Sequence, residues 1–328
     1  MYKLYVVADI FKVRIETNCE KFEAYMDAYM EDFRRLTINF ERCKSSEDEY
    51  DMSFLYIDSA EYKLELLSDD TVCLRSPWER INKSTVVPMA FRLIVEILRQ
   101  KKHEIKMHAS AVAKDGTAIL FIAPSEGGKT STAMKMCQKY GCELIANDAA
   151  VVSYVDETPM VLRGDSLFKV RANGMQVYSN DSNDALGKTE TDTPWYEKQI
   201  IATEELGILK ADKALKLKYI FFVKLDALVK NSSILKYSTE DENDRWFKQR
   251  MMVLQNISGT VRGVDLIPTG NDGMVLPLFI PSVDTIQLSM FRTEFVNALF
   301  SDCEVYQARG QLDEIAKFID NVAFGDQL

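Results

Sequence analysis

A strand-like run, a pair of glycines and a lysine follow one another between Ala118 and Met134, in the segment AILFIAPSEGGKTSTAM. The run AILFI is typical of a buried strand, and TSTAMKMCQKY has the pattern of a helix that Gly141 closes. The segment CELIANDAAVVSYV then returns to strand-like residues. This order of strand, loop, helix and strand predicts an α/β unit, with the loop at the end of its first strand.

The loop matches the phosphate-binding pattern G-x-x-x-x-G-K-[ST] at every position except the first, which is Ala123. Small residues allow successive backbone N–H groups to point at phosphate oxygens, and the positive end of the following helix favours anions. Lys129 would reach the β- and γ-phosphates, and the Thr130 hydroxyl would bind magnesium. We therefore predict a nucleotide-binding loop formed by Ser125, Glu126, Gly127, Gly128, Lys129, Thr130 and Ser131.

Two residues of this loop need an explanation. The methyl group of Ala123 is the smallest side chain that can replace glycine, and a negative φ would accommodate it. A carboxylate at Glu126 would repel phosphate, so we expect its side chain to face solvent while the backbone forms the cradle. The alternative interpretation of SEGGKTS is a flexible turn ahead of an ordinary helix.

Two more polar residues belong to the strands around the loop. Asp148 lies in LIANDAAVV, where a carboxylate on a neighbouring strand would help to hold a metal or position an acceptor hydroxyl. His108 lies in KMHASAV, one predicted strand before the loop. Each also has a plainer interpretation: His108 as a hydrogen-bonded strand residue, and Asp148 as a carboxylate that caps a turn.

The ordered segments MHASAV, AILFIAPSEGGKTSTA and ELIANDAAVV resemble the catalytic domain of HPr kinase/phosphorylase and its related serine kinases. CEVYQARGQLDEIAKFI is similar to the terminal strand and helix of that family. The resemblance implies a phosphoenolpyruvate carboxykinase-type nucleotide-binding core that uses ATP and Mg²⁺ to phosphorylate a serine hydroxyl. It also implies catalytic roles for Lys129, Asp148 and His108, with Thr130 and Asp148 on the metal.

One position departs from the family pattern. The family has two adjacent aspartates, and the first, proposed as its general base, is Asn147 in this chain. Asparagine cannot take up a proton. Asp148 would then combine two roles, His108 would serve as the base, or the loose transition state of phosphoryl transfer would need little help from a base.

The length of 328 residues suggests two domains. Residues 1–104 alternate strand-like segments, among them RRLTINFE, DMSFLYID, YKLELL and TVCLR, with helix-like ones, and they contain no catalytic motif. VVPMAFRLIVEILRQKK is the expected helix at the end of this part. We predict an α/β protein with a mixed α/β N-terminal domain over 1–104 and a C-terminal HPr-kinase-like phosphate-loop core over 105–328. Within the core, the polar residues 173–198 are expected to form a long loop.

The formal net charge of −10 gives no bulk positive field that would attract nucleic acid or an anionic membrane. No stretch of about 18 apolar residues occurs, and the N-terminus lacks the pattern of a signal peptide, so a cytoplasmic location is expected. The six cysteines form no CxxC pair, which argues against a zinc site.

The sequence therefore predicts an ATP- and Mg²⁺-dependent kinase whose acceptor is a serine on a protein, a peptide or a small molecule. Its partners would be the nucleotide and that acceptor, and a homo-oligomer is compatible with the chain. Two alternatives stay open. The first is a chain that binds nucleotide without catalysing a reaction, which Ala123, Glu126 and Asn147 favour. The second is a peptide-modification or partner-binding module in which residues 1–104 recognise a leader or substrate chain.

Overall fold

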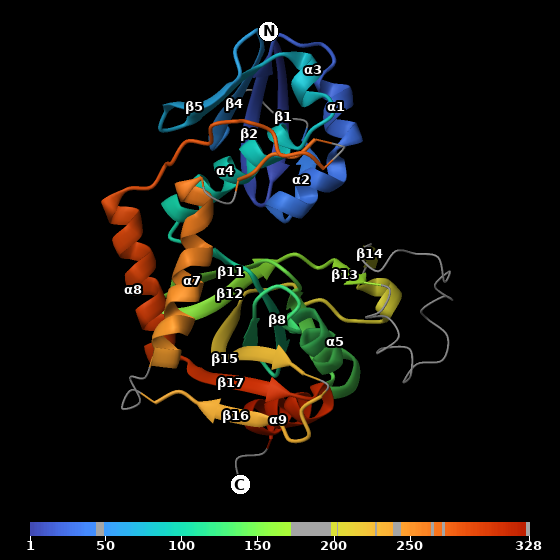
Figure 1. Ribbon diagram of the computed structural model, residues 1–328, viewed down its shortest axis with the longest axis vertical. Coiled ribbons are helices and arrows are strands. Elements are labelled where there is room, and N and C mark those ends of the chain that lie inside the picture. The colour runs from blue at the N-terminus through green and yellow to red at the C-terminus, as the bar shows by residue number, and fades with distance from the viewer. Residues whose placement is uncertain are drawn as a thin grey trace. The chain divides into compact units, whose positions relative to one another are not determined.

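The computed structural model describes residues 1–43, 49–171, 198–201, 203–226, 228–238, 244–263, 266–270 and 273–325. The chain divides into two compact units, coloured along the sequence in Figure 1. Unit 1 comprises Met1–Lys106 and Met252–Phe295, and unit 2 comprises Met107–Met251 and Val296–Leu328. Residues 173–197 of the expected long loop lie outside the described residues.

This division differs from the expected one. The chain first passes from unit 1 to unit 2 after Lys106, close to the expected boundary at 104. Residues 252–295, however, belong to unit 1 instead of the second domain. Their apolar side chains explain the return, because Leu266 is buried in the core of unit 1 and Leu276 and Leu278 pack against it. Such contacts between distant parts of a chain leave no local pattern in the sequence.

Unit 1 contains a mixed six-stranded sheet in the order β3-β1-β2-β4-β6-β5. Strand β2 is parallel to β4, and β4 to β6, whereas the remaining pairs are antiparallel. The strands are β1 (Tyr2–Ala8), β2 (Phe11–Thr17), β3 (Phe40–Arg42), β4 (Met52–Asp58), β5 (Lys63–Ser68) and β6 (Thr71–Ser76). The strand-like segments of the sequence predict β4, β5 and β6 correctly.

The helices in the N-terminal part of unit 1 are α1 (Phe22–Ala28), α2 (Met30–Thr37), α3 (Trp78–Ile81) and α4 (Val86–Lys101). Helix α4 is the one expected from the apolar spacing, and its Phe91 ring meets Phe33, Phe40 and Phe54 at centroid distances of 5.1 to 5.4 Å. The expected strand RRLTINFE is wrong in its first half. Phe33 and Thr37 are buried at helical spacing, so α2 continues to Thr37 before β3 begins.

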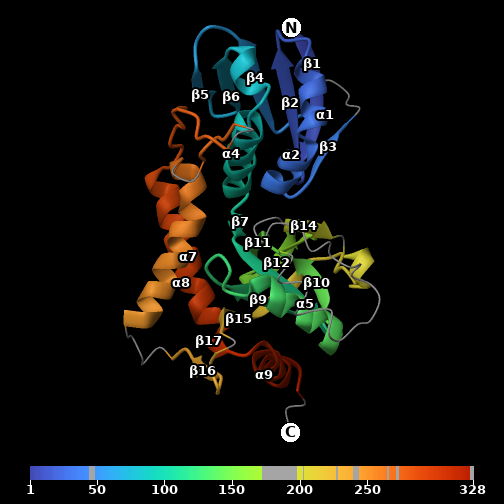
Figure 2. The same cartoon turned by 45° about the vertical axis from the view of Figure 1, so that its right-hand side comes forward.

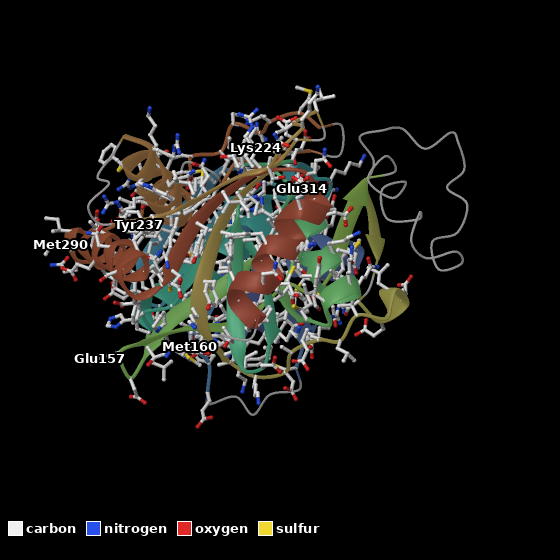
Figure 3. All side chains as sticks on the ribbon, turned by 90° about the horizontal axis from the view of Figure 1, so that it is seen from below. Glu157, Met160, Lys224, Tyr237, Met290 and Glu314 are labelled. Atoms are coloured by element: carbon white, nitrogen blue, oxygen red, sulfur yellow. The ribbon has the colours of Figure 1, made fainter. Side chains whose placement is uncertain are left out.

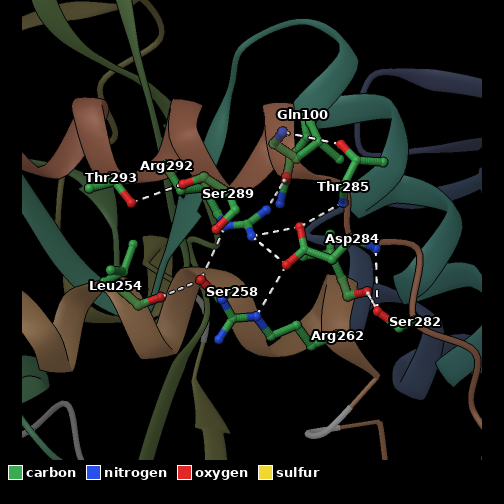
Figure 4. Close-up of polar contacts among 12 residues, drawn as sticks. Gln100, Leu254, Ser258, Arg262, Ser282, Asp284, Thr285, Ser289, Arg292 and Thr293 are labelled. Atoms are coloured by element: carbon green, nitrogen blue, oxygen red, sulfur yellow. Dashed lines mark hydrogen bonds and ion pairs between the residues drawn. The ribbon is translucent and has the colours of Figure 1, made fainter.

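A buried polar cluster links residues 252–295 to α4 (Figure 4). Arg292 has no exposed side-chain surface and donates to Gln100 of α4, to Ser258 and to both carboxylate oxygens of Asp284. Arg262 also donates to Asp284, at 3.1 Å. A buried guanidinium needs an anion and several acceptors to offset its desolvation, and these residues supply them.

Unit 2 contains a mixed nine-stranded sheet, whose main path is β10-β8-β9-β15-β12-β11-β7; β17 joins it at β15 and β16 joins at β17. Its strands are β7 (Ile105–Met107), β8 (Ala109–Lys114), β9 (Thr117–Ile122), β10 (Glu143–Ala146), β11 (Ala150–Val155), β12 (Thr158–Gly164), β15 (Leu215–Leu225), β16 (Ser233–Lys236) and β17 (Glu304–Gly310). A separate pair comprises β13 (Phe168–Arg171) and β14 (Lys198–Ile201), and the turn η1 covers Glu204–Leu206.

Strands β9, β15 and β17 are parallel, so their carboxyl ends meet at one edge of this sheet. In Figure 3, Lys224 marks that edge on β15, and Met160, which is paired with Lys216 near the start of the strand, marks the opposite edge. Asp115 and Gly116 both have positive φ in the β8–β9 turn, which is typical of an Asp-Gly pair in a two-residue hairpin.

The remaining helices are α5 (Lys129–Tyr140), α7 (Asp244–Arg262), α8 (Ile286–Asp302) and α9 (Leu312–Phe324). Helices α5 and α9 pack on each other and on the same face of the sheet, α5 on β8 and β9 and α9 on β17 (Figure 2). Successive residues of β15 point to opposite faces, because Phe221 contacts Phe318 of α9 and Phe222 contacts Phe300 of α8. No helix in the described part of the chain is long and apolar enough to span a membrane.

Candidate functional site

The loop of interest joins β9 to α5 and contains two glycines that have no room for a side chain. A Cβ on Gly127 would lie 2.6 Å from the Cβ of Ala123, and one on Gly128 would lie 2.3 Å from Cγ of Leu225. The backbone N–H of Leu225 donates to the Gly127 carbonyl at 3.0 Å. The loop therefore packs closely against the carboxyl end of β15.

The backbone of this loop alternates in conformation. Glu126 has φ +65° and Gly128 has φ +104°, whereas Gly127 between them lies outside the left-handed region. Alternation of this kind turns successive N–H groups toward one concavity, which suits an anion. Ser125 and Glu126 are exposed, so the carboxylate of Glu126 has access to solvent.

Lys129, the first residue of α5, is only 6% exposed. Its ammonium group donates to the carbonyl oxygens of Ala123 at 3.0 Å and Pro124 at 3.3 Å, and lies 3.0 Å from Nε2 of His108. An ammonium group has donors only, so Nε2 accepts and the ring proton is assigned to Nδ1. The lysine is thus held under the loop rather than extended into solvent.

His108 and Asp148 complete a series with this lysine. Nδ1 of His108 lies 3.5 Å from a carboxylate oxygen of Asp148, and the two side chains are 44% and 43% exposed. The structure therefore brings together Lys129, His108 and Asp148, the three residues predicted to be catalytic. Their roles in a reaction stay a prediction.

Sheet topology places these residues at one edge. His108 directly precedes β8, whose first residue, Ala109, is opposite Ile122 at the end of the antiparallel β9. Strand β10 is antiparallel to β8, and it ends at Ala146 on the same side. Residues that follow β9 and β10 and precede β8 therefore meet.

Asn147 is buried beside this group, and its side-chain amide cannot take up a proton. The side chain is 1% exposed, and its Nδ2 donates to the carbonyl oxygen of Leu167 at 2.8 Å. Its backbone N–H donates to Asp165 and its carbonyl accepts from Ser110. The residue thus ties the end of β10 to residues 165–167. The sequence suggested only the loss of a base here, because nothing local marks this distant contact.

Thr130 and Ser131 lie in the first turn of α5 and are half-buried. Among the described residues, no group of three or more histidine, cysteine, aspartate or glutamate side chains forms a metal cage. Magnesium commonly uses one or two carboxylates together with water and phosphate oxygens. Oxygen donors from Thr130 and Asp148 fit that chemistry, whereas they would not suit a structural zinc ion.

Sequence reasoning missed two residues on the other side of the loop. Asp226 follows β15, and its carboxylate accepts from Arg309 of β17 at 2.9 Å and from the N–H of Leu228 at 3.2 Å. The hydrogen bond from Arg309, and to a lesser extent the one from the Leu228 N–H, holds the pKa of Asp226 below its ordinary value. The register of β9, β15 and β17 brings this pair beside the loop, and no motif in the sequence marks it.

Unit 1 has a cleft of its own, with a volume of about 490 Å³. Its charged lining residues are Glu79, Arg80 and Lys83, and its apolar lining includes Met274 and Val275, which are largely exposed. The guanidinium of Arg80 lies 4.8 Å from the centre of the Tyr62 ring. The cleft therefore combines two cationic side chains and one carboxylate with an apolar wall.

Known protein families and curated proteins give no match to this chain. Among solved structures, a similar chain is the Hpr(Ser) kinase/phosphatase from Coxiella burnetii, with 11% sequence identity and a TM-score of 0.27. The similarity covers 40% of this chain and 76% of the other. It is a weak resemblance over part of the chain, so a function has to be argued from the site itself.

Proposed function

We propose that unit 2 binds a nucleoside triphosphate with Mg²⁺ and transfers a phosphoryl group to a serine hydroxyl, in the manner of HPr-kinase-like serine kinases. The observation that carries the proposal is the series of Lys129, His108 and Asp148 beside a loop with alternating backbone conformation. A lysine and a carboxylate next to a loop whose N–H groups could bind phosphate are groups that phosphoryl transfer uses, and a histidine can serve as its base.

Each residue has a role in this proposal. The N–H groups of the loop and the ammonium of Lys129 bind phosphate oxygens, and Thr130 with Asp148 would hold the magnesium ion. Bound magnesium supplies charge neutralisation. His108 keeps Lys129 and Asp148 in place through its two ring nitrogens, and either His108 or Asp148 accepts the proton of the hydroxyl. Positioning of the reacting groups and electrostatic stabilisation account for most of the rate enhancement in this proposal.

The test measures binding of Mg²⁺·ATP by calorimetry and formation of ADP in the presence of serine-containing peptides. We expect Lys129→Ala and Asp148→Asn to lower ADP formation by at least 100-fold, in the range of lost electrostatic stabilisation. Lys139→Ala is the matched control, because Lys139 lies on the same helix, is about half exposed and pairs with Asp313. Equal turnover in wild type and Lys129→Ala would reject the proposal.

Binding without chemistry is a second candidate, and Asn147 favours it, because a buried amide that bonds Leu167 stands at the position of the expected base and cannot take up a proton. If the chain only binds nucleotide, it would bind Mg²⁺·ATP with an affinity that depends on Lys129 but would form no ADP with any acceptor. Turnover that depends on an added acceptor distinguishes the kinase from the binding protein.

Recognition of a substrate chain by unit 1 is a third candidate, and the cleft between residues 62–84 on one side and 270 and 274–277 on the other favours it. An acidic peptide with apolar residues would complement Arg80, Lys83 and the apolar wall. Fluorescence anisotropy on the full chain tests this idea, with Arg80→Glu and Lys83→Glu expected to abolish peptide binding. The full chain is necessary because residues 1–104 alone lack one wall of the cleft.

A further inference from the structure

The loop between β9 and α5 has polar groups on two sides, and only one side enters the proposed chemistry. His108 and Asp148 lie toward β8 and β10, on one side of β9. Asp226 and Arg309 lie at the ends of β15 and β17, on the other side of β9. A ligand that extends along this edge of the sheet would therefore meet one pair at each end.

The strand register brings Asp226 level with the loop. Phe222 pairs with Ile122, the last residue of β9, so β15 continues three residues beyond it to Leu225. Leu225 then contacts the loop through its N–H bond to the Gly127 carbonyl. Asp226 is the next residue, and its own N–H donates to Gly310 at the end of β17.

The carboxylate of Asp226 is fixed before any ligand arrives. Arg309 holds one oxygen and the Leu228 N–H holds the other. A carboxylate has about four acceptor positions, so these two bonds leave capacity for two more donors. The side chain is 23% exposed, so a ligand can reach it.

Together these observations decide which way a nucleotide would lie. In the proposed function the terminal phosphate is directed to His108 and Asp148, so the nucleoside extends toward β15 and β17. We propose that Asp226 accepts hydrogen bonds from the ribose hydroxyls of the bound nucleotide, with Arg309 as the residue that positions it. Ligands commonly bind beyond the carboxyl ends of strands in such sheets, and an acidic side chain is a suitable acceptor for vicinal hydroxyls. This inference rests on the proposed function, because the phosphates set the direction.

The test compares three probes by calorimetry: ADP, 2′,3′-dideoxy-ADP and inorganic tripolyphosphate, all with Mg²⁺. Wild type is expected to bind ADP roughly tenfold more tightly than the dideoxy analogue, as a hydrogen bond to a charged group allows. In Asp226→Ala this preference disappears while the affinity for tripolyphosphate does not fall. Asp226→Asn keeps one acceptor oxygen and should retain part of the preference.

Glu304→Gln is the matched control. Glu304 lies on the same β17, pairs with Lys236 at 2.7 Å, and stands at the amino end of that strand, away from the loop. We expect this variant to behave as wild type toward all three probes. Two results would overturn the inference: a wild type that binds ADP and dideoxy-ADP equally, or an Asp226→Ala variant that loses tripolyphosphate and ADP alike. A wild type that binds none of the probes would reject the proposed function as well.

Discussion

The ammonium nitrogen of Lys129 lies 3.0 Å from Nε2 of His108. Because the lysine is positively charged and can only donate, the contact requires a neutral imidazole with its proton on Nδ1, on the side of Asp148. The three side chains therefore lie in the order lysine, histidine, carboxylate, with Nδ1 of His108 3.5 Å from Asp148. We expect a histidine in this position to act first on the placement of its two neighbours, and this dependence can be tested.

The variants His108→Gln and His108→Leu distinguish a role of His108 in positioning its neighbours from a role in taking up the hydroxyl proton. Glutamine retains an oxygen that can accept from Lys129, whereas leucine has no acceptor. We expect His108→Leu to lower turnover of Mg²⁺·ATP by roughly 100-fold and His108→Gln by less than tenfold, measured as initial rates of ADP formation. Equal losses in the two variants would show instead that the imidazole itself takes up the proton.

Asn147→Asp should lower the stability of the fold rather than supply a general base. The introduced carboxylate would be buried and would lose the N–H that donates to Leu167. We expect a loss of about 2–4 kcal/mol in the free energy of unfolding by urea at pH 7. Burial raises the pKa of such a carboxyl, and the protonated form can donate to Leu167, so the loss should shrink at pH 5. Asp148→Asn, at a half-exposed site, is the control and should change stability by less than about 0.5 kcal/mol.

Glu126→Gly should stabilise the protein and also alter nucleotide binding. Glu126 has φ +65°, a conformation that glycine adopts without strain, so a gain of about 0.5–1 kcal/mol in unfolding free energy is expected. Loss of the carboxylate near the loop should also tighten binding of ATP at low salt. Glu157→Gly is a matched control, because Glu157 has φ +61° in the β11–β12 turn. It should gain similar stability with no change in ATP affinity.

The Arg292–Asp284 pair should make unit 1 sensitive to acid. Burial alone would raise the pKa of Asp284, but hydrogen bonds from Arg292 and Arg262 outweigh it and hold the pKa below its ordinary value. A lowered pKa means that this stabilisation is complete above about pH 4 and is lost as the pH falls further. Asp284→Asn should therefore cost about 2–4 kcal/mol at pH 7, and the difference from wild type should shrink below about pH 4.

Urea unfolding at several pH values measures this difference, and an exposed ion pair serves as the comparison. Arg34 and Glu31 pair at 3.2 Å with both side chains largely in solvent. Glu31→Gln should change stability by less than about 0.5 kcal/mol at every pH, because solvent screens the pair. A similar small effect for Asp284→Asn would show that the buried cluster contributes little.

Local patterns predicted the elements that a short stretch of sequence determines. The strand–loop–helix segment appears as β9, the loop and α5, and Gly141 ends α5 with φ +69° as the helix-stop signal indicates. Local patterns also fail in identifiable places. The stretch around Arg34 and Arg35 has strand-like residues, but the burial of Phe33 and Thr37 on one face makes it helical.

Contacts between distant residues were the part that the sequence could not supply. The return of residues 252–295 to unit 1 depends on Leu266 and Arg292 meeting partners more than 150 residues away in α4 and its surroundings. Burial of Asn147 and the approach of Asp226 to the loop likewise follow from sheet order, which composition and spacing do not encode. The loop lysine, histidine and aspartate could be named in advance because each lies next to a recognisable strand.

The 2.6 Å separation between the Ala123 methyl group and a hypothetical Cβ on Gly127 means that the two positions share space for one methyl group. An alanine at the first position of the loop is therefore compatible with the fold because the fifth position is glycine. A comparison that scores each position separately would count the alanine as a defect and the glycine as incidental. Glycine at the first position would remove the clash that a Cβ at the fifth has with Ala123, although that Cβ would still lie 3.1 Å from the Pro124 carbonyl oxygen. The two positions should therefore vary together wherever this loop geometry is inherited.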